Sequence, residues 1–190
     1  REIGHRPMES QALQACGRII GIYRGAYTSG PNLLEDFQLF SRGRRRKISH
    51  ILHRSDPLLR TEVYIFDYYY RRGSGHSGDH RQTVFFVHSK FLALPLFEMK
   101  PETLLHKIGA LLGFEDIDFE EFPKFSRQYR LKGPDESFIR ASLNEKVLSF
   151  FSEEKNWYLE GINYYMIFYK YNKLLRPEEI RTFYQKGMRI

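Results

Sequence analysis

The sequence predicts an α+β fold: a largely antiparallel sheet built on a long central hairpin, with helices packed on it. Three observations predict this class. Runs of β-branched and aromatic residues, which are typical of strands, follow one another through short loops. Helical patterns gather after these runs, and the regular strand–helix alternation of a parallel sheet is absent. Aromatic residues make up 16% of the chain, which favours a sheet with wide aromatic faces.

The central hairpin is predicted over residues 61–88. Its two apolar and aromatic runs, 63–70 and 83–87, flank a loop rich in glycine and serine. Because both faces of both runs are apolar or aromatic, we expect paired strands inside a sheet covered on both sides. Asp67 interrupts the first run, where an unpaired charge would be costly. We interpret Asp67 as a structural residue that fixes the register, either paired with Arg81 across the strands or hydrogen-bonded as a carboxylate.

The chain divides into an N-terminal region, 1–35, and a main α+β domain, 36–190, expected as one compact unit. The first region is predicted to hold a helix over 8–16 and a short strand. In the main domain a strand over 48–53 precedes the hairpin, and Pro95 predicts an edge strand or an irregular extended segment. The later elements predicted are a helix over 101–113, a strand over 125–132, helices after Gly133 and Asn144, a hairpin around 161–163, and a helix starting at Pro177.

Charge and cysteine content narrow the functional classes. The formal net charge is +7 and the pI is about 9.4, which favours anionic partners. A single cysteine, Cys16, excludes an internal disulfide framework and a cysteine-based metal cluster, so a reducing compartment is the simpler expectation. No apolar run approaches the roughly 18–20 residues that span a bilayer. The location expected is the cytoplasm, at the inner face of the membrane if an anchor precedes Arg1.

The densest charge run predicts an anion-binding surface. Five cations fall within six residues, and three arginines near the hairpin tip are expected to extend the same positive face. Candidate partners are an anionic lipid, a nucleic acid or an acidic protein, and the oligomeric state stays open. The alternative is an exposed turn with solvated arginines. The predicted anion-binding residues are Arg42, Arg44, Arg45, Arg46, Lys47, Arg71, Arg72 and Arg81.

The loop over residues 73–80 offers three further chemistries. Its glycines resemble a phosphate loop, but the loop leads into a strand and lacks the Gly-Lys-Ser/Thr ending. Ser77 could serve a hydrolase, yet no Gly-x-Ser-x-Gly elbow is present. His76, Asp79 and His80 could ligate a metal, as could the acidic stretch 116–121, although neither matches a known ligand spacing. No cofactor is expected, and no residue is assigned a catalytic role.

A set of motifs resembles one group of proteins. They are FDYYYRRGSG (66–75), RQTV (81–84), LPLFEMKPE (94–102), DIDF (116–119) and PKFSRQYRLKGPDE (123–136), followed by the phenylalanine pair at 150–151. In this order they resemble a family of bacterial proteins of unknown activity, which often carry an N-terminal membrane-spanning segment before a soluble domain. The resemblance covers roughly residues 36–186 and implies a membrane-tethered bacterial domain, with no activity to carry over.

The function expected is therefore a non-enzymatic binding or scaffold domain. It would present its basic surface to an anionic or protein partner. The alternative is a metal-assisted hydrolase that uses the 73–80 loop. A deep pocket with converging polar groups would favour the enzyme, and a flat basic face would favour the binding domain.

Overall fold

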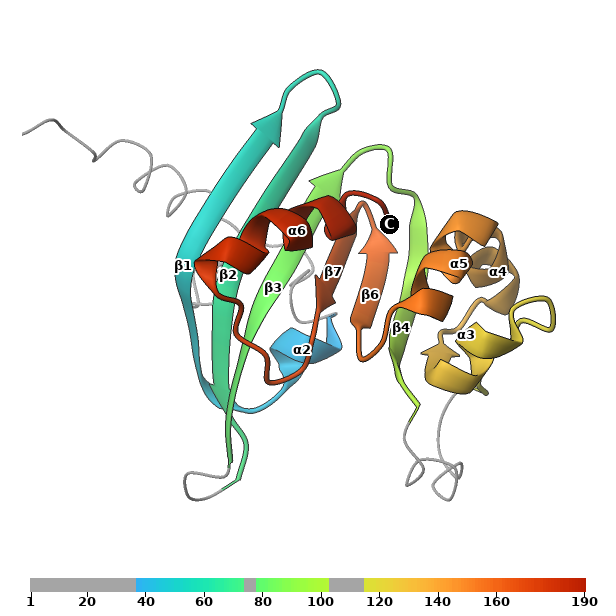
Figure 1. Cartoon of the computed structure of the whole chain (residues 1–190), viewed down its shortest axis with the longest axis horizontal. Coiled ribbons are helices and arrows are strands. Elements are labelled where there is room, and N and C mark those ends of the chain that lie inside the picture. The colour runs from blue at the N-terminus through green and yellow to red at the C-terminus, as the bar shows by residue number, and fades with distance from the viewer. Residues whose placement is uncertain (1–36, 74–77, 103–114) are drawn as a thin grey trace, which may run out of the picture.

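The computed structural model describes residues 37–73, 78–102 and 115–190, and within them it forms one seven-stranded sheet (Figure 1). Every neighbouring pair of strands is antiparallel, in the order β1-β2-β3-β7-β6-β4-β5. The predicted α+β class is confirmed. The strands are β1 (Arg44–Asp56), β2 (Thr61–Arg71), β3 (Asp79–Ser89), β4 (Leu94–Pro101), β5 (Tyr129–Lys132), β6 (Tyr158–Asn163) and β7 (Tyr165–Tyr169).

The predicted central hairpin is β2–β3. Its register runs without a break from Thr61 opposite Ser89 to Arg71 opposite Asp79. β1 pairs with the outer side of β2 and β7 with the outer side of β3, so both hairpin strands lie inside the sheet. The composition of the two runs, which suits a surface buried on both sides, explains this position.

β1 is longer than predicted and forms one edge of the sheet. It begins at Arg44, so most of the basic run lies in a strand, and the alternative of a simple turn is wrong. The pairing with β2 shifts between Arg44 and Lys47 and again between Ser49 and Leu52. A non-glycine residue with positive φ, Arg45 in the first case and His50 in the second, lies within each irregular step, as is typical of β-bulges.

Two other predictions need correction. β4 pairs with both β5 and β6, so the predicted edge strand at Pro95 is wrong. The pairing with β6 is irregular between Leu94 and Phe97, which agrees with the alternative prediction of an irregular extended segment. The strand predicted over 125–132 is a helix, α3 (Pro123–Gln128), followed by the short strand β5. Pro123 sits in the first turn, where its missing N–H costs nothing, and the apolar alternation that suggested a strand holds only from residue 129 onward.

Most of the remaining described helices agree with the sequence. α4 (Glu136–Ser142) is capped by Asp135, and α5 (Glu145–Glu153) is capped by Asn144, whose side chain accepts from the N–H groups of residues 146 and 147. α6 (Pro177–Gly187) begins at the predicted proline. A short helix that the sequence did not predict, α2 (Gln38–Ser41), precedes β1. The elements predicted in 1–35 and residues 103–113 of the helix predicted over 101–113 lie outside the described residues. Pro101, predicted in the first turn of that helix, instead ends β4 opposite Tyr129.

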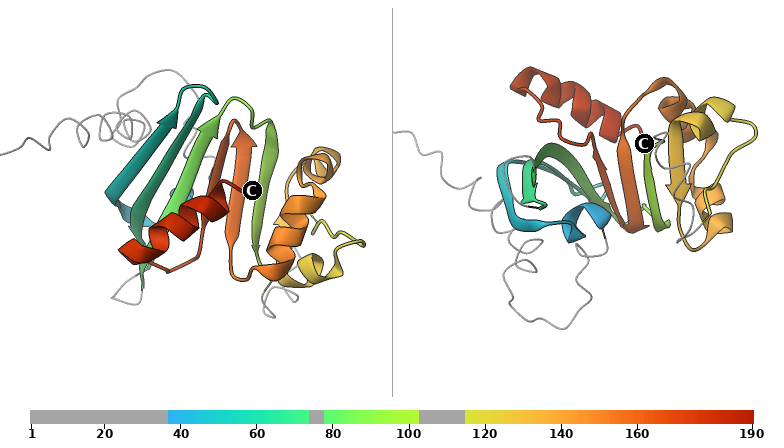
Figure 2. Two further views of the ribbon diagram at one scale, coloured as in Figure 1. Left: turned by 45° about the horizontal axis from the view of Figure 1, so that its top comes forward. Right: turned by 90° about the horizontal axis from the view of Figure 1, so that it is seen from below.

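α6 and α2 lie on opposite faces of the sheet (Figure 2), and each face carries a core of its own. The helix-side core packs Ile65, Phe85 and Phe168 against buried residues of α3, α4, α5 and α6. The aromatic core, on the opposite face, joins buried residues of α2 to the other side of the same strands, including Tyr68 and Tyr169. Because successive side chains of a strand point to opposite faces, each central strand contributes to both cores.

Candidate anion-binding site

A polar pocket of about 450 Å³ opens on the aromatic face, lined by Arg42, Gly43, Arg72, Lys100 and Tyr158. Each polar residue comes from a different part of the chain. Arg42 follows α2 and Arg72 follows β2, whereas Lys100 lies near the end of β4 and Tyr158 begins β6. Three cations therefore converge on one hollow. Such a set of donors suits a group that carries several oxygen atoms and a negative charge.

Alternation along β4 and β6 explains how the pocket is built. Phe97 and Met99 of β4 lie in the helix-side core, so Glu98 and Lys100 project to the opposite face. In β6, Leu159 belongs to the helix-side core and the flanking residues point the other way. β4 and β6 are neighbours in the sheet, which places the polar side chains of both strands side by side.

Gly43 gives the chain its path around the pocket. Its φ is +67°, a conformation that other residues rarely adopt. An added Cβ atom would lie 2.5 Å from Cδ2 of Tyr70 and 2.6 Å from the carbonyl oxygen of Arg71. Only glycine lets the segment between α2 and β1 pass this close to the end of β2, and that passage positions Arg42.

Glu98 partly neutralises the pocket. Its Oε1 lies 3.6 Å from Nη2 of Arg42 and 2.9 Å from Nζ of Lys100. Arg72 is exposed, and none of the described residues forms an ion pair with it. One carboxylate thus faces three cations at the pocket, and the local charge stays positive.

A buried carboxylate, Glu160, lies behind the pocket. It is 3% exposed and accepts hydrogen bonds from the backbone N–H groups of Gln38 and Leu39, at 2.5 and 3.2 Å. The hydroxyl of Tyr169 donates to it at 3.3 Å. Burial, reinforced by the nearby Glu98, raises the pKa of Glu160 to about 7, although the two N–H bonds and Arg42 oppose the shift. This carboxyl group therefore titrates near neutral pH.

The arginine beside this carboxyl keeps its charge. Burial alone would lower the pKa of Arg42, but the surrounding Tyr169, Glu98 and Glu160 outweigh burial and raise it. Burial also raises the pKa of the Tyr158 and Tyr169 hydroxyls, so both stay protonated hydrogen-bond donors. Their rings stack with centroids 5.1 Å apart and form an aromatic wall beside the pocket.

The structure divides the predicted positive face into several environments. Arg42 and Arg72 line the pocket, but Arg71 binds Asp79 through Nε and Nη2, at 2.6 and 3.1 Å, on the opposite face. The Arg81 guanidinium lies 5.5 Å from the ring centroid of Tyr69. Of the basic run, Lys47 pairs opposite Tyr69 and Arg45 is exposed, while Arg44 and Arg46 donate to backbone carbonyls at Gly73, Gly43 and Ser41.

Asp67 has partners other than Arg81. Thr83 Oγ1 donates to one carboxylate oxygen at 2.7 Å, and His50 Nδ1 lies 2.8 Å from the other. Thr83 is the residue directly opposite Asp67 in the hairpin register, whereas Arg81 faces Tyr69. The hydrogen-bonded alternative for Asp67 is therefore the one that the structure contains.

The proposed metal ligands of the hairpin loop do not converge among the described residues. Asp79 is held by Arg71, whose hydrogen bonds are the main cause that lowers the Asp79 pKa to about 2. His80 lies between Tyr70 and Tyr171, and its Nδ1 is 2.8 Å from the Tyr171 hydroxyl. His76 falls outside the described residues. In the part of the chain that the structure describes, no three histidine, cysteine or acidic residues gather as a metal site.

Sequence reasoning missed Lys100, Tyr158 and Glu160. Lys100 lies between the extended segment around Pro95 and the helix predicted over 101–113, and Glu160 lies in a predicted hairpin. The sequence offers one weak signal: Glu160, like Asp67, is an acidic residue in a predicted strand. None of these three residues lies near the basic run in sequence, so no local pattern could connect them to it.

Comparison with known proteins gives no relative. No family model, curated protein or solved structure matches the chain. The resemblance to bacterial membrane-tethered domains thus stays a prediction. None of the helices that the structure describes is both long and apolar enough to cross a membrane.

Proposed function

We propose that this chain is a binding domain that holds a phosphate-bearing ligand in the pocket between Arg42, Arg72 and Lys100. The observation that carries the proposal is the convergence of three cations and a tyrosine hydroxyl on one polar hollow. Guanidinium groups match the oxygens of phosphate in paired hydrogen bonds, and an ammonium adds a compact charge. The volume of about 450 Å³ lies in the range of roughly 300–1,000 Å³ common for small-ligand sites.

Binding is favoured over catalysis by the state of the nearby carboxylates. Glu98 is engaged by Arg42 and Lys100, and Glu160 is buried behind them. Neither is free to activate a water molecule in the pocket, so the pocket supplies charge and shape. Because Arg72 is exposed at the rim, we propose that it engages the ligand from the solvent side and that Arg42 holds it from within.

Isothermal titration with inorganic pyrophosphate tests the proposal. We expect saturable binding that weakens as salt rises, since screening acts on exposed charges. Arg72→Gln should weaken binding at least tenfold, because a charge-assisted hydrogen bond contributes about 1.5–3 kcal/mol. Arg127→Gln, which removes an exposed arginine on α3, is the matched control and should bind like the wild type. Equal weakening by both variants, or no saturable binding, would refute a specific site.

The larger anionic partners can be distinguished with the same variants. If the pocket recognises a lipid headgroup, binding to phosphatidylserine vesicles should fall with Arg72→Gln and stay unchanged with Arg127→Gln. If the partner is a nucleic acid, the same pattern should appear with DNA or RNA and be absent with vesicles. Binding that responds equally to every lost cation indicates general charge attraction and not this pocket.

A further inference from the structure

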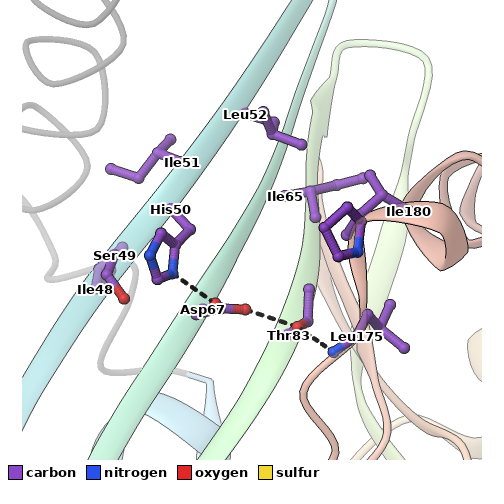
Figure 3. Close-up of a pocket in the computed structure, with 11 residues that line it drawn as sticks. Ile48, Ser49, His50, Ile51, Leu52, Ile65, Asp67, Thr83, Leu175 and Ile180 are labelled. Atoms are coloured by element: carbon purple, nitrogen blue, oxygen red, sulfur yellow. Dashed lines mark hydrogen bonds and ion pairs between the residues drawn. The ribbon is translucent and has the colours of Figure 1, made fainter.

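A second hollow lies on the helix-side face, between β1, β2 and α6 (Figure 3). It encloses about 760 Å³, and most of its lining is apolar. An adjoining hollow of about 370 Å³ shares four lining residues with it: Leu52, Ile65, Pro177 and Ile180. Because they share these walls, the two hollows form one groove that follows β1 and α6.

One end of the groove is polar and negatively charged. The Thr83 hydroxyl accepts from the backbone N–H of Leu175 at 3.0 Å and donates to Asp67 at 2.7 Å (Figure 3). His50 Nδ1 meets the second Asp67 oxygen at 2.8 Å. Thr83 Oγ1 and His50 Nδ1 thus each contact one oxygen of Asp67, which is the one acidic side chain among the described residues that line the groove. A ligand with an anionic head would be repelled from this end.

The bulge in β1 creates this end of the groove. Between Ser49 and Leu52 the strand gains one residue relative to β2. His50 takes φ +50° there, an uncommon conformation for a non-glycine residue. The irregular step turns the imidazole toward Asp67, and it leaves Leu52, which is 53% exposed, at the mouth of the groove.

The other end of the groove is basic. Arg54 of β1 and Arg181 of α6 are exposed and line opposite walls of the smaller hollow. The Arg54 guanidinium lies 5.4 Å from the ring centroid of Tyr184. No ion pair joins either arginine to a carboxylate among the described residues. Two cations from separate elements thus face one opening, with an apolar channel leading away from it.

We propose that the groove beneath α6 binds a medium-chain fatty acid, with its carboxylate between Arg54 and Arg181 and its chain along Leu52, Ile65 and Ile180. The charges at the two ends set the orientation of the ligand. On β2, which has no bulge, the step from Asp67 to Val63, the residue opposite Arg54, covers about 13 Å at roughly 3.3 Å per residue. The apolar part of the groove therefore suits a chain such as decanoate. This site faces away from the phosphate pocket and is independent of it.

Calorimetric titration of the whole chain with decanoate, below the concentration at which it forms micelles, tests the site. Decanoate should bind about tenfold more tightly than octanoate, because two more methylene groups leave water. Decylamine, which has the same chain and a cationic head, should bind at least tenfold more weakly than decanoate. If decylamine binds as tightly, or if decanoate gives no saturable heat, the proposed site is wrong.

Two kinds of variant separate the head contact from the chain contact. Arg181→Gln and Arg54→Gln should each weaken the binding of decanoate at least fivefold. Leu52→Gln should also weaken the binding of decanoate, and it should not strengthen the binding of decylamine. All three positions are exposed, so the melting temperature should stay close to that of the wild type. Arg127→Gln, on α3, and Arg72→Gln, in the phosphate pocket, should leave decanoate binding unchanged. Weakening by these two controls, or none by the groove variants, would overturn the proposal.

Discussion

Phe168 and Tyr169 are adjacent in β7, and their side chains point to opposite faces of the sheet. Phe168 packs with centroids 4.1 Å from Trp157 and 5.7 Å from Phe183, inside an apolar core closed by helices. Tyr169 is equally buried, but its hydroxyl reaches Glu160. One face is thus stabilised by burial of apolar surface, and the other combines aromatic packing with a buried ionisable group.

The two faces also differ in the cavities that they carry. The helix-side core is formed by hydrophobic side chains, and a groove opens where α6 meets the edge strand β1. The aromatic face keeps a titratable carboxyl next to a cationic pocket. Burial of a polar group costs free energy unless it is hydrogen-bonded, and the three hydrogen bonds that Glu160 accepts offset part of this cost. Four variants test this contrast.

Phe168→Ala should give the largest effect. The side chain is fully buried, and its removal leaves a cavity between Trp157 and Phe183. We expect the free energy of unfolding to fall by about 3–5 kcal/mol, measured by denaturant titration. Phe91→Ala, at a position 73% exposed, should change it by less than about 0.5 kcal/mol. Similar effects at the two positions would contradict the packing of this face.

Glu160→Gln should change the pH dependence of stability. Burial raises the pKa of Glu160 from its ordinary 4.5 to about 7, so the folded protein holds this proton more tightly than the unfolded chain does. The contribution of this group to stability therefore falls as pH rises from about 4.5 to 7, by on the order of 3 kcal/mol in total.

The variant cannot titrate, so its stability relative to the wild type should improve across that window. Denaturant titrations at several pH values measure this slope. Glu153→Gln removes an exposed carboxylate, 76% exposed at its side chain, and should keep the wild-type profile. A Glu160→Gln profile parallel to that of the wild type would show that the carboxyl does not titrate near neutrality.

Thr83→Val tests the polar end of the groove on the helix-side face. The buried hydroxyl donates to Asp67 and accepts from the N–H of Leu175, and valine can do neither. We expect a loss of about 1–3 kcal/mol in the free energy of unfolding, because both partners lose a hydrogen bond. Thr182→Val, on the exposed side of α6, is the control. Equal stability of the two variants would mean that Asp67 is held by other contacts.

Tyr169→Phe should give the smallest effect. It removes only the 3.3 Å hydrogen bond to Glu160 and keeps the ring packing, so we expect a loss of about 1 kcal/mol. Loss of a donor to the charged form should also raise the pKa of Glu160 further, which shifts the pH profile upward. Tyr165→Phe removes a hydroxyl that forms no hydrogen bond among the described residues. If the pH profile of stability shifts equally in Tyr169→Phe and Tyr165→Phe, the shift does not come from the hydrogen bond between Tyr169 and Glu160.

Local patterns in the sequence predict much of the fold. The hairpin 61–88, the caps at Asp135 and Asn144 and the helix start at Pro177 all follow from residue types whose preferences act within a few positions. The failure at 125–128 has a local cause as well. Phe125, Arg127, Tyr129 and Leu131 alternate as a strand would, yet the proline at 123 starts a helix that ends only at Gln128.

The sequence by itself determined the class of fold, its central hairpin and its basic character, because hydrophobic period, turn residues and charge act over short stretches of chain. Only the tertiary structure decided which cations act together. Arg71 and Arg72 are neighbours in the chain, but Arg71 forms an ion pair with Asp79 and Arg72 lines the pocket. Lys100, from a distant strand, lines the same pocket as Arg42. Strand alternation and strand order set these neighbours, and both depend on pairings between residues far apart in sequence.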